Sequence, residues 1–186
     1  RKWFNNNFSK IQLQIDIIEN SIMGSISEKC KKIKIVLTDV DGVLTDGGMY
    51  YTKEGDIMKR FHTRDGMGVT LLRKRNIPTI VITKEKTPMV KNWSSKMKIK
   101  KLYDGIIKKE SMIEIICKKF QINSEEMAYI GDDINDLELL KKVGLSASPN
   151  DGVELIKKEC DYICKKNGGE GVFREVADLI INHQKR

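Results

Sequence analysis

The 186-residue sequence has few aromatic residues, few cysteines and no long apolar run. No stretch approaches the roughly 18 consecutive apolar residues of a membrane-spanning helix. No charged and apolar leader with a small-residue cleavage site is found, so we expect a cytoplasmic protein without a membrane partner. The cysteines lack the paired spacing and nearby histidines of a zinc site, which predicts four reduced, structural thiols, Cys30, Cys117, Cys160 and Cys164.

The sequence has a net charge of +8, and many of its lysines occur in pairs. These pairs are not interleaved with aromatic residues, which make up only 6% of the chain. No pattern specific to nucleic-acid binding is therefore found, and we expect no nucleic-acid partner. The lysines indicate a solvated surface, and their excess positive charge favours a small anionic substrate.

From residue 31 onward, short apolar stretches alternate with segments of helical period. This alternation predicts an α/β fold in which helices cover both faces of a mostly parallel sheet. The expected strands are Ile33–Asp39, a hairpin of Met49–Thr52 and Ile57–His62, Thr79–Thr83, Leu102–Tyr103, Met127–Gly131, Leu145–Ala147 and Tyr162–Cys164. The expected helices are Gly66–Arg75, one that Thr87 and Pro88 open, Glu110–Phe120, Asn135–Val143, Val153–Lys158 and Val172–Asn182. Because the first residues differ in pattern, we predict an appendage or linker over 1–30 and one domain over 31–186.

Two of the expected strands end directly in clustered acids. One is followed by Asp39 and Asp41, and a later one by a Gly-Asp-Asp-Ile-Asn-Asp segment that contains Asp132, Asp133 and Asp136. Close carboxylates repel each other unless a cation or a proton lies between them. This favours a Mg²⁺ site with one carboxylate free to attack and another free to exchange protons. The alternative is a structural role at turns and helix starts, where Asp-Gly and Asp are common.

Two further strand ends carry polar residues suited to phosphate. Thr83 ends one strand, where its hydroxyl can donate to a phosphate oxygen, or where it is simply the end of a strand. Lys108 and Lys109 follow another strand, and one of them can neutralise phosphate, although lysine is normally a surface residue. Because ligands of parallel sheets bind at the carboxyl ends of the strands, we expect these groups to meet the acids at one edge.

In order along the chain, these motifs resemble the four motifs of the haloacid dehalogenase superfamily. The matching residues are Asp-Val-Asp-Gly-Val-Leu-Thr at 39–45, Thr83, Lys109 and Gly-Asp-Asp-Ile-Asn-Asp at 131–136. The resemblance implies a Rossmann-like three-layer sandwich with a hairpin inserted after the first strand. Only 41 residues separate Asp41 from Thr83 and 25 separate Thr83 from Lys109, which leaves no room for the cap domain of larger members.

The resemblance also implies a phosphatase mechanism. Asp39 would attack phosphorus and form an aspartyl-phosphate, while Asp41 would protonate the leaving alcohol and later activate water. The resemblance further implies that Asp39, the backbone carbonyl of Asp41, Asp132 and waters hold Mg²⁺, and that Thr83 and Lys109 bind phosphate. Asp136 and Asp133 would orient Lys109 or a metal-bound water.

Residues 44–51, 61–66 and 168–175 resemble the branch that dephosphorylates eight- and nine-carbon 2-keto-3-deoxy sugar acid phosphates. Membership implies a homotetramer in which a neighbour's hairpin and the C-terminal segment help to close the site. Glu85 matches the pattern of enzymes for nonulosonate 9-phosphates rather than 3-deoxy-D-manno-octulosonate (KDO) 8-phosphate, with an exposed loop glutamate as the alternative. The resemblance therefore favours a nonulosonate 9-phosphate as the substrate over KDO 8-phosphate. Arg64 and Arg174 are candidates for binding the substrate carboxylate, or for surface or interface ion pairs.

A second interpretation is the tetramer-forming C-terminal module of an acylneuraminate cytidylyltransferase, which residues 160–175 also resemble. Degenerate modules of that kind lose the catalytic aspartates, whereas both acidic motifs are complete here, which favours an active phosphatase. A signalling receiver domain is excluded, because neither His62 nor Thr83 at the relevant strand ends is an aspartate.

Overall fold

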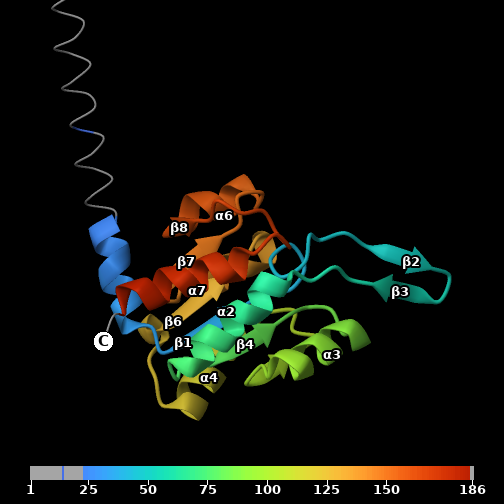
Figure 1. Cartoon of the computed structure of the whole chain (residues 1–186), viewed down its shortest axis with the longest axis horizontal. Helices are drawn as coiled ribbons and strands as arrows, with labels where there is room; N and C mark the ends of the chain where they lie inside the picture. The colour runs from blue at the N-terminus through green and yellow to red at the C-terminus, as the bar shows by residue number, and fades with distance from the viewer. Residues whose placement is uncertain (1–13, 15–22, 185–186) are drawn as a thin grey trace, which may run out of the picture.

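A six-stranded parallel sheet forms the centre of the protein in a computed structural model that describes residue 14 and residues 23–184 (Figure 1). The strand order is β5-β4-β1-β6-β7-β8. The strands are β1 (Ile35–Thr38), β4 (Thr79–Ile82), β5 (Lys101–Tyr103), β6 (Met127–Ile130), β7 (Leu145–Ser148) and β8 (Tyr162–Ile163). The α/β class and the parallel sheet predicted from the sequence are therefore confirmed.

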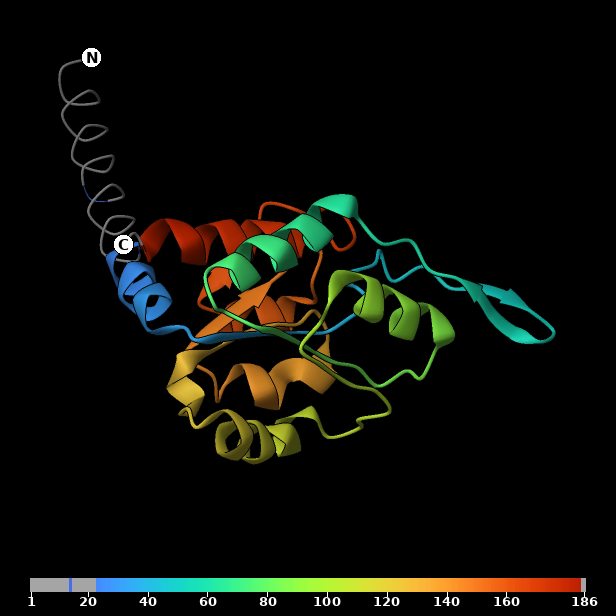
Figure 2. The ribbon, with the colours of Figure 1, turned by 60° about the horizontal axis from the view of Figure 1, so that its bottom comes forward.

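Helices cover both faces of this sheet and make three layers (Figure 2). Side chains alternate between the faces along each strand, so Val36 packs in one core and its neighbours Ile35 and Leu37 pack in the other. The helices on the Val36 face are α2 (Thr63–Lys74), α3 (Pro88–Met97) and α7 (Val172–His183). The helices on the other face are α4 (Met112–Phe120), α5 (Leu137–Leu140) and α6 (Glu154–Glu159).

A local sequence signal explains how α3 starts, whereas two other helices start differently from the prediction. The Thr87 hydroxyl accepts a hydrogen bond from the Val90 backbone N–H at 3.3 Å, and Pro88 is the first helical residue of α3, as predicted. Two expected helices begin instead with 3₁₀ turns, η1 (Lys109–Ser111) before α4 and η3 (Ile134–Asp136) before α5. These tighter turns carry residues of the site described below.

A β-hairpin of β2 (Tyr50–Thr52) and β3 (Gly55–Met58) projects from the body of the molecule (Figures 1 and 2). The expectation that its second strand spans Ile57–His62 is wrong, because the ladder ends at Met58. Phe61 instead forms an isolated bridge with Thr45 and stacks on Trp93. The projecting part exposes large apolar side chains, Met49, Tyr50, Tyr51, Ile57 and Met58.

Most of the predicted appendage, residues 1–30, lies outside the described residues. Residues 23–32 are helical, and Ile26 and Cys30 are buried in the core on the Val36 face. The end of the predicted appendage therefore packs on the domain, and for the remaining residues the appendage stays a prediction. Among the helices that the structure describes, none has the length and apolar character needed to cross a membrane.

Candidate active site

The polar strand ends singled out in the sequence meet at one edge of the sheet. Asp39 directly follows β1, Thr83 follows β4 and Asp132 follows β6. They open into a cleft of about 160 Å³, as expected for the carboxyl ends of parallel strands. The residues lining this cleft are Asp39, Asp41, Thr83, Lys84, Glu85, Asp132, Asp133 and Asn135.

A tight turn after β1 positions the first pair of acids. The Val40 carbonyl accepts hydrogen bonds from the backbone N–H groups of residues 43, 44 and 45 at 2.9–3.2 Å. Gly42 within this turn has a φ of +85°, and a Cβ at that position would lie only 1.9 Å from Asp132 Oδ2. A side chain at residue 42 would therefore displace Asp132, which explains the need for glycine at this position.

Lys109 lies fully buried between two carboxylates. Its Nζ is 2.7 Å from Asp39 Oδ2 and 2.6 Å from Asp136 Oδ1. Burial opposes the charge of Lys109, but the two carboxylates outweigh it and raise the lysine pKa, so the side chain stays cationic. Lys108 is exposed, and the 3₁₀ turn η1 directs only the second lysine of the pair inward.

Asp136 stabilises this arrangement by accepting several hydrogen bonds. Its carboxylate accepts hydrogen bonds from Lys109 Nζ, from the Tyr129 hydroxyl at 2.5 Å and from the Asp132 backbone N–H at 3.0 Å. Asp133 caps η3 by accepting from the Ile134 N–H at 2.7 Å, so the capping alternative describes its observed contact. Tyr129 was not among the predicted site residues, although a tyrosine inside an apolar strand indicates a buried hydroxyl that needs a partner.

Three carboxylates crowd around a single lysine in this cluster. One oxygen from each of Asp39, Asp132 and Asp136 lies within 4.8 Å of the others. Burial, and then the neighbouring carboxylates, raise the pKa of Asp39 to about 7 and that of Asp132 to about 8. Asp132 Oδ1 is buried without a hydrogen-bond partner among the described residues. Hard oxygen ligands with uncompensated negative charge fit a divalent cation held by Asp39 and Asp132, since protein donors already occupy Asp136.

The second acid, Asp41, is anchored by a lysine that the sequence analysis did not single out. Asp41 Oδ1 accepts a hydrogen bond from Lys59 Nζ at 2.7 Å and from the Thr45 hydroxyl at 3.2 Å. Burial disfavours the charge on Lys59, but Asp41 and Asp56 outweigh this effect and raise the lysine pKa. A lysine within an exposed hairpin offers no pattern that distinguishes it from a surface residue, so no sequence signal indicates this contact.

The predicted substrate-binding residues fall into two groups. Glu85 lines the same cleft as the acidic cluster. Arg64 and Arg174 line a different cavity of about 570 Å³, which shares no lining residue with the cleft. Arg174 also donates to Asp178 at 2.8 Å, as the ion-pair alternative expects. Within one chain, therefore, the structure brings Glu85 to the acids but leaves both arginines apart from them.

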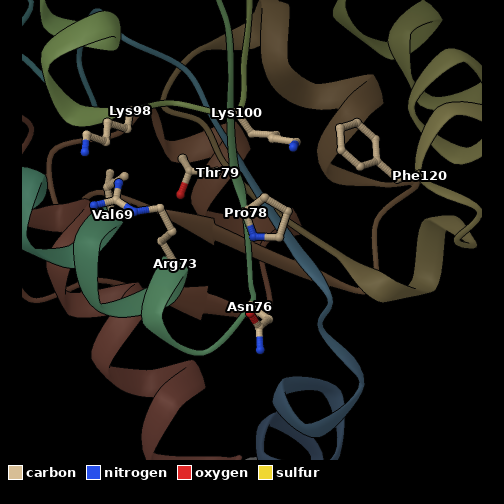
Figure 3. Close-up of a pocket in the computed structure, with 8 residues that line it drawn as sticks. All are labelled: Val69, Arg73, Asn76, Pro78, Thr79, Lys98, Lys100 and Phe120. Atoms are coloured by element: carbon tan, nitrogen blue, oxygen red, sulfur yellow. The ribbon is translucent and has the colours of Figure 1, made fainter.

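Another cavity, of about 340 Å³, lies at the opposite end of the sheet, beside the starts of β4 and β5 (Figure 3). Arg73, Lys98 and Lys100 give it a positive lining without any carboxylate. It offers neither a nucleophile nor metal ligands comparable with those in the cleft. The cleft at the carboxyl ends of the strands is therefore the candidate active site.

Comparison with known proteins identifies the family of the chain. A family model described as haloacid dehalogenase-like hydrolase matches residues 18–176. The chain belongs to this family. It is an enzyme of the phosphatase type, because it matches known phosphatases over most of its own length and of theirs.

Two of these relatives are 3-deoxy-D-manno-octulosonate 8-phosphate phosphatases. The Haemophilus influenzae protein is 35% identical over 159 residues, which cover 86% of this chain and 88% of the relative. The Escherichia coli K12 protein is 34% identical over 160 residues, which cover 86% of this chain and 85% of the relative. These relatives confirm the resemblance to the sugar-acid phosphatase branch and give no support to the cytidylyltransferase module.

Solved structures show the same fold. The Moraxella catarrhalis 3-deoxy-D-manno-octulosonate 8-phosphate phosphatase, in complex with magnesium, phosphate and KDO, aligns with a TM-score of 0.83 at 36% identity. That alignment covers 86% of this chain and 91% of the other. The cobalt-bound phosphatase from Haemophilus influenzae aligns with a TM-score of 0.82 at 36% identity and covers 84% of this chain and 91% of the other.

Proposed function

We propose that this enzyme is a Mg²⁺-dependent phosphatase that hydrolyses a 2-keto-3-deoxy sugar acid phosphate, with KDO 8-phosphate as its substrate. The observation that carries the proposal is the buried Asp39–Lys109–Asp136 cluster, which opens beside Asp132 into a cleft. The activities named for the relatives supply the substrate class.

In the first step, the Asp39 carboxylate attacks phosphorus. Lys109 binds Asp39 Oδ2, which leaves Oδ1 as the attacking atom. A P–O bond to the aspartate forms while the P–O bond to the sugar breaks, and Asp41 gives a proton to the departing alkoxide oxygen. In the second step, Asp41 takes a proton from water, whose oxygen attacks phosphorus, releases inorganic phosphate and regenerates the Asp39 carboxylate.

Thr83 and Lys109 stabilise the transferring phosphoryl group in this scheme. The Thr83 hydroxyl oxygen accepts a hydrogen bond from the Glu85 backbone N–H at 3.3 Å, so its own proton is free to donate to a phosphoryl oxygen. Lys109 supplies a buried positive charge. Such a charge stabilises the negative charge of the transition state more strongly inside the protein than it would in water. Asp136 orients Lys109 through the contact described above.

The carboxylates of Asp39 and Asp132 and the backbone carbonyl of Asp41 would hold Mg²⁺, an ion that prefers oxygen ligands. When bound, Mg²⁺ neutralises the repulsion between these carboxylates and the incoming phosphate. Asp132 Oδ1, which is buried and has no hydrogen-bond partner within the described part of the chain, supports this assignment.

A nonulosonate 9-phosphate is the second candidate substrate, and Glu85 favours it. The Glu85 side chain lines the cleft beside Thr83, where it can accept hydrogen bonds from sugar hydroxyls. A phosphate-release screen with Mg²⁺ over KDO 8-phosphate, 2-keto-3-deoxynonulosonate 9-phosphate and N-acetylneuraminate 9-phosphate separates the candidates. The highest kcat/KM for KDO 8-phosphate supports the proposal, and activity on none of the three contradicts it.

The role of Glu85 is tested by Glu85→Ala in the same screen. We expect weaker discrimination among the three sugar acids, while release from 4-nitrophenyl phosphate changes less. Glu114→Ala, at an exposed position of α4, is the matched control. If Glu85→Ala leaves the substrate ranking unchanged, Glu85 does not contact the sugar.

We further propose a homotetramer in which hairpin and C-terminal segments of neighbouring subunits close the cleft. The exposed apolar side chains of the hairpin support this assembly, because exposed apolar patches commonly mark protein interfaces. Arg64 and Arg174 would then bind a substrate carboxylate in a neighbour's cleft, since they lie apart from the cleft of their own chain. Light scattering should give four times the chain mass of 21.3 kDa, and a monomer mass would contradict the assembly.

A further inference from the structure

Lys59 is a buried lysine at the base of an exposed hairpin. Its side chain is 2% exposed, although the hairpin strands β2 and β3 beside it are largely exposed. Its Nζ lies 2.7 Å from Asp41 Oδ1 and 3.5 Å from Asp56 Oδ2. Lysine is almost never buried without a partner, and here one partner is the proposed acid and base.

The contacts of Asp41 are divided between its two oxygens. Oδ1 accepts hydrogen bonds from Lys59 and from the Thr45 hydroxyl. Within residues 23–184, no hydrogen bond engages Oδ2, and the Asp41 side chain is 30% exposed where it lines the cleft. One oxygen is therefore fixed by the protein, while the other stays available to a ligand.

We propose that Lys59 is a positioning residue that fixes the orientation of Asp41 for proton transfer. It holds Oδ1 and leaves Oδ2 to give a proton to the leaving alcohol and later to accept one from water. Because Lys59 directly follows β3, the hairpin sets the orientation of the acid in the cleft. This inference rests on the proposed function, in which Asp41 is that acid.

The dependence of rate on the leaving group isolates this role. The sugar alkoxide released from KDO 8-phosphate needs a proton, whereas 4-nitrophenolate leaves without one. The kcat/KM for each substrate reports the barrier to forming the aspartyl-phosphate from free enzyme. The ratio of the two kcat/KM values, measured on one preparation, is independent of the fraction of folded enzyme. A purely structural defect therefore leaves the ratio unchanged.

The test compares Lys59→Met with Asp41→Asn and with Lys119→Met. Lys119 is an exposed lysine near the end of α4, outside the hairpin, so its variant is the matched control. General acid catalysis contributes about 10²–10⁴-fold, so Lys59→Met should lower kcat/KM for KDO 8-phosphate by roughly 10²-fold and for 4-nitrophenyl phosphate by less than about 3-fold. Asp41→Asn should show at least the same selectivity, and Lys119→Met should show none.

The outcomes separate the inference from the proposed function. Suppose that Asp41→Asn lowers kcat/KM selectively for the sugar phosphate, but Lys59→Met lowers kcat/KM equally for both substrates or for neither. The positioning role of Lys59 is then wrong, and the assignment of Asp41 as the acid stands. If Asp41→Asn is itself unselective, the acid assignment fails and the role of Lys59 fails with it. A selective loss in Lys59→Met, absent from Lys119→Met, supports the inference.

Discussion

Replacing Lys109 with methionine should destabilise the metal-free protein strongly and in a pH-dependent way. The substitution keeps an apolar chain in the buried site but removes the cation that lies 2.7 Å from Asp39 and 2.6 Å from Asp136. Removing one partner of a buried ion pair costs about 3–5 kcal/mol, because the remaining charges are uncompensated. For a protein of this size, that corresponds to a loss of roughly 6–20 °C in melting temperature.

The sign of the pH dependence follows from the carboxylate pKa values. Burial already raises the pKa of Asp39 to about 7, far above the value of about 3.9 in an unfolded chain, and loss of Lys109 raises it further. A raised folded-state pKa gives stability that is present at low pH and is lost as the pH rises through that pKa. The destabilisation of Lys109→Met relative to wild type should therefore be larger at pH 8 than at pH 5.5.

Urea unfolding in the presence of a metal chelator, at both pH values, measures this difference. Lys108→Met is the matched control, because its side chain is exposed and its substitution should change stability by less than about 0.5 kcal/mol. If Lys109→Met unfolds with the same free energy as Lys108→Met at pH 8, the buried cluster does not form as described. A loss of equal size at both pH values would refute the electrostatic reasoning.

Two other predictions concern the same cluster. Asp39→Asn should abolish Mg²⁺-dependent phosphate release from the sugar acid phosphate with little loss of folding, because the amide is not a nucleophile; near-normal turnover would refute the role of Asp39. Mg²⁺ should raise the melting temperature more at pH 8 than at pH 6, because protons compete for Asp39 and Asp132, whose pKa values are about 7 and about 8. A Mg²⁺-induced shift that is the same at pH 6 and pH 8 would show that these carboxylates do not bind the ion.

The acidic strand ends were the part of the site most readily predicted from sequence. An apolar run that stops at Asp39, and another that stops before Asp132, indicate both the strands and their carboxyl ends. The rule that parallel strands present these ends at one edge then brings the acids together. The fold and the acidic cluster could therefore be predicted from the sequence, because they depend on hydrophobic pattern and topology alone.

The contacts that depend on local backbone geometry could not be predicted from the sequence in the same way. Lys108 and Lys109 are equivalent in the sequence, and only the 3₁₀ turn η1 decides which of them points inward. The end of the hairpin ladder at Met58, which precedes the inward turn of Lys59, likewise has no pattern in the sequence. Residues whose role depends on which way one turn faces are therefore found only in the structure.

The positions of Arg64 and Arg174 relative to the cleft could not be predicted from the sequence either, because they depend on how two helices pack. Arg64 lies at the start of α2 and Arg174 at the start of α7, and the packing of these helices on each other places both in a cavity away from the cleft. A sequence motif identifies such residues as charged and near functional segments. It does not show whether they face their own site or, as we propose, that of another subunit.

The central claim is that acids from two separate strand ends hold one divalent ion. The most direct measurement is an anomalous diffraction experiment on crystals of the protein soaked in Mn²⁺, with Asp132→Asn as control. We expect a single anomalous peak in the cleft, in contact with Asp39 and Asp132, that is absent or much weaker in the variant. Acids apart from each other with no peak between them, or an undiminished peak in Asp132→Asn, would contradict it.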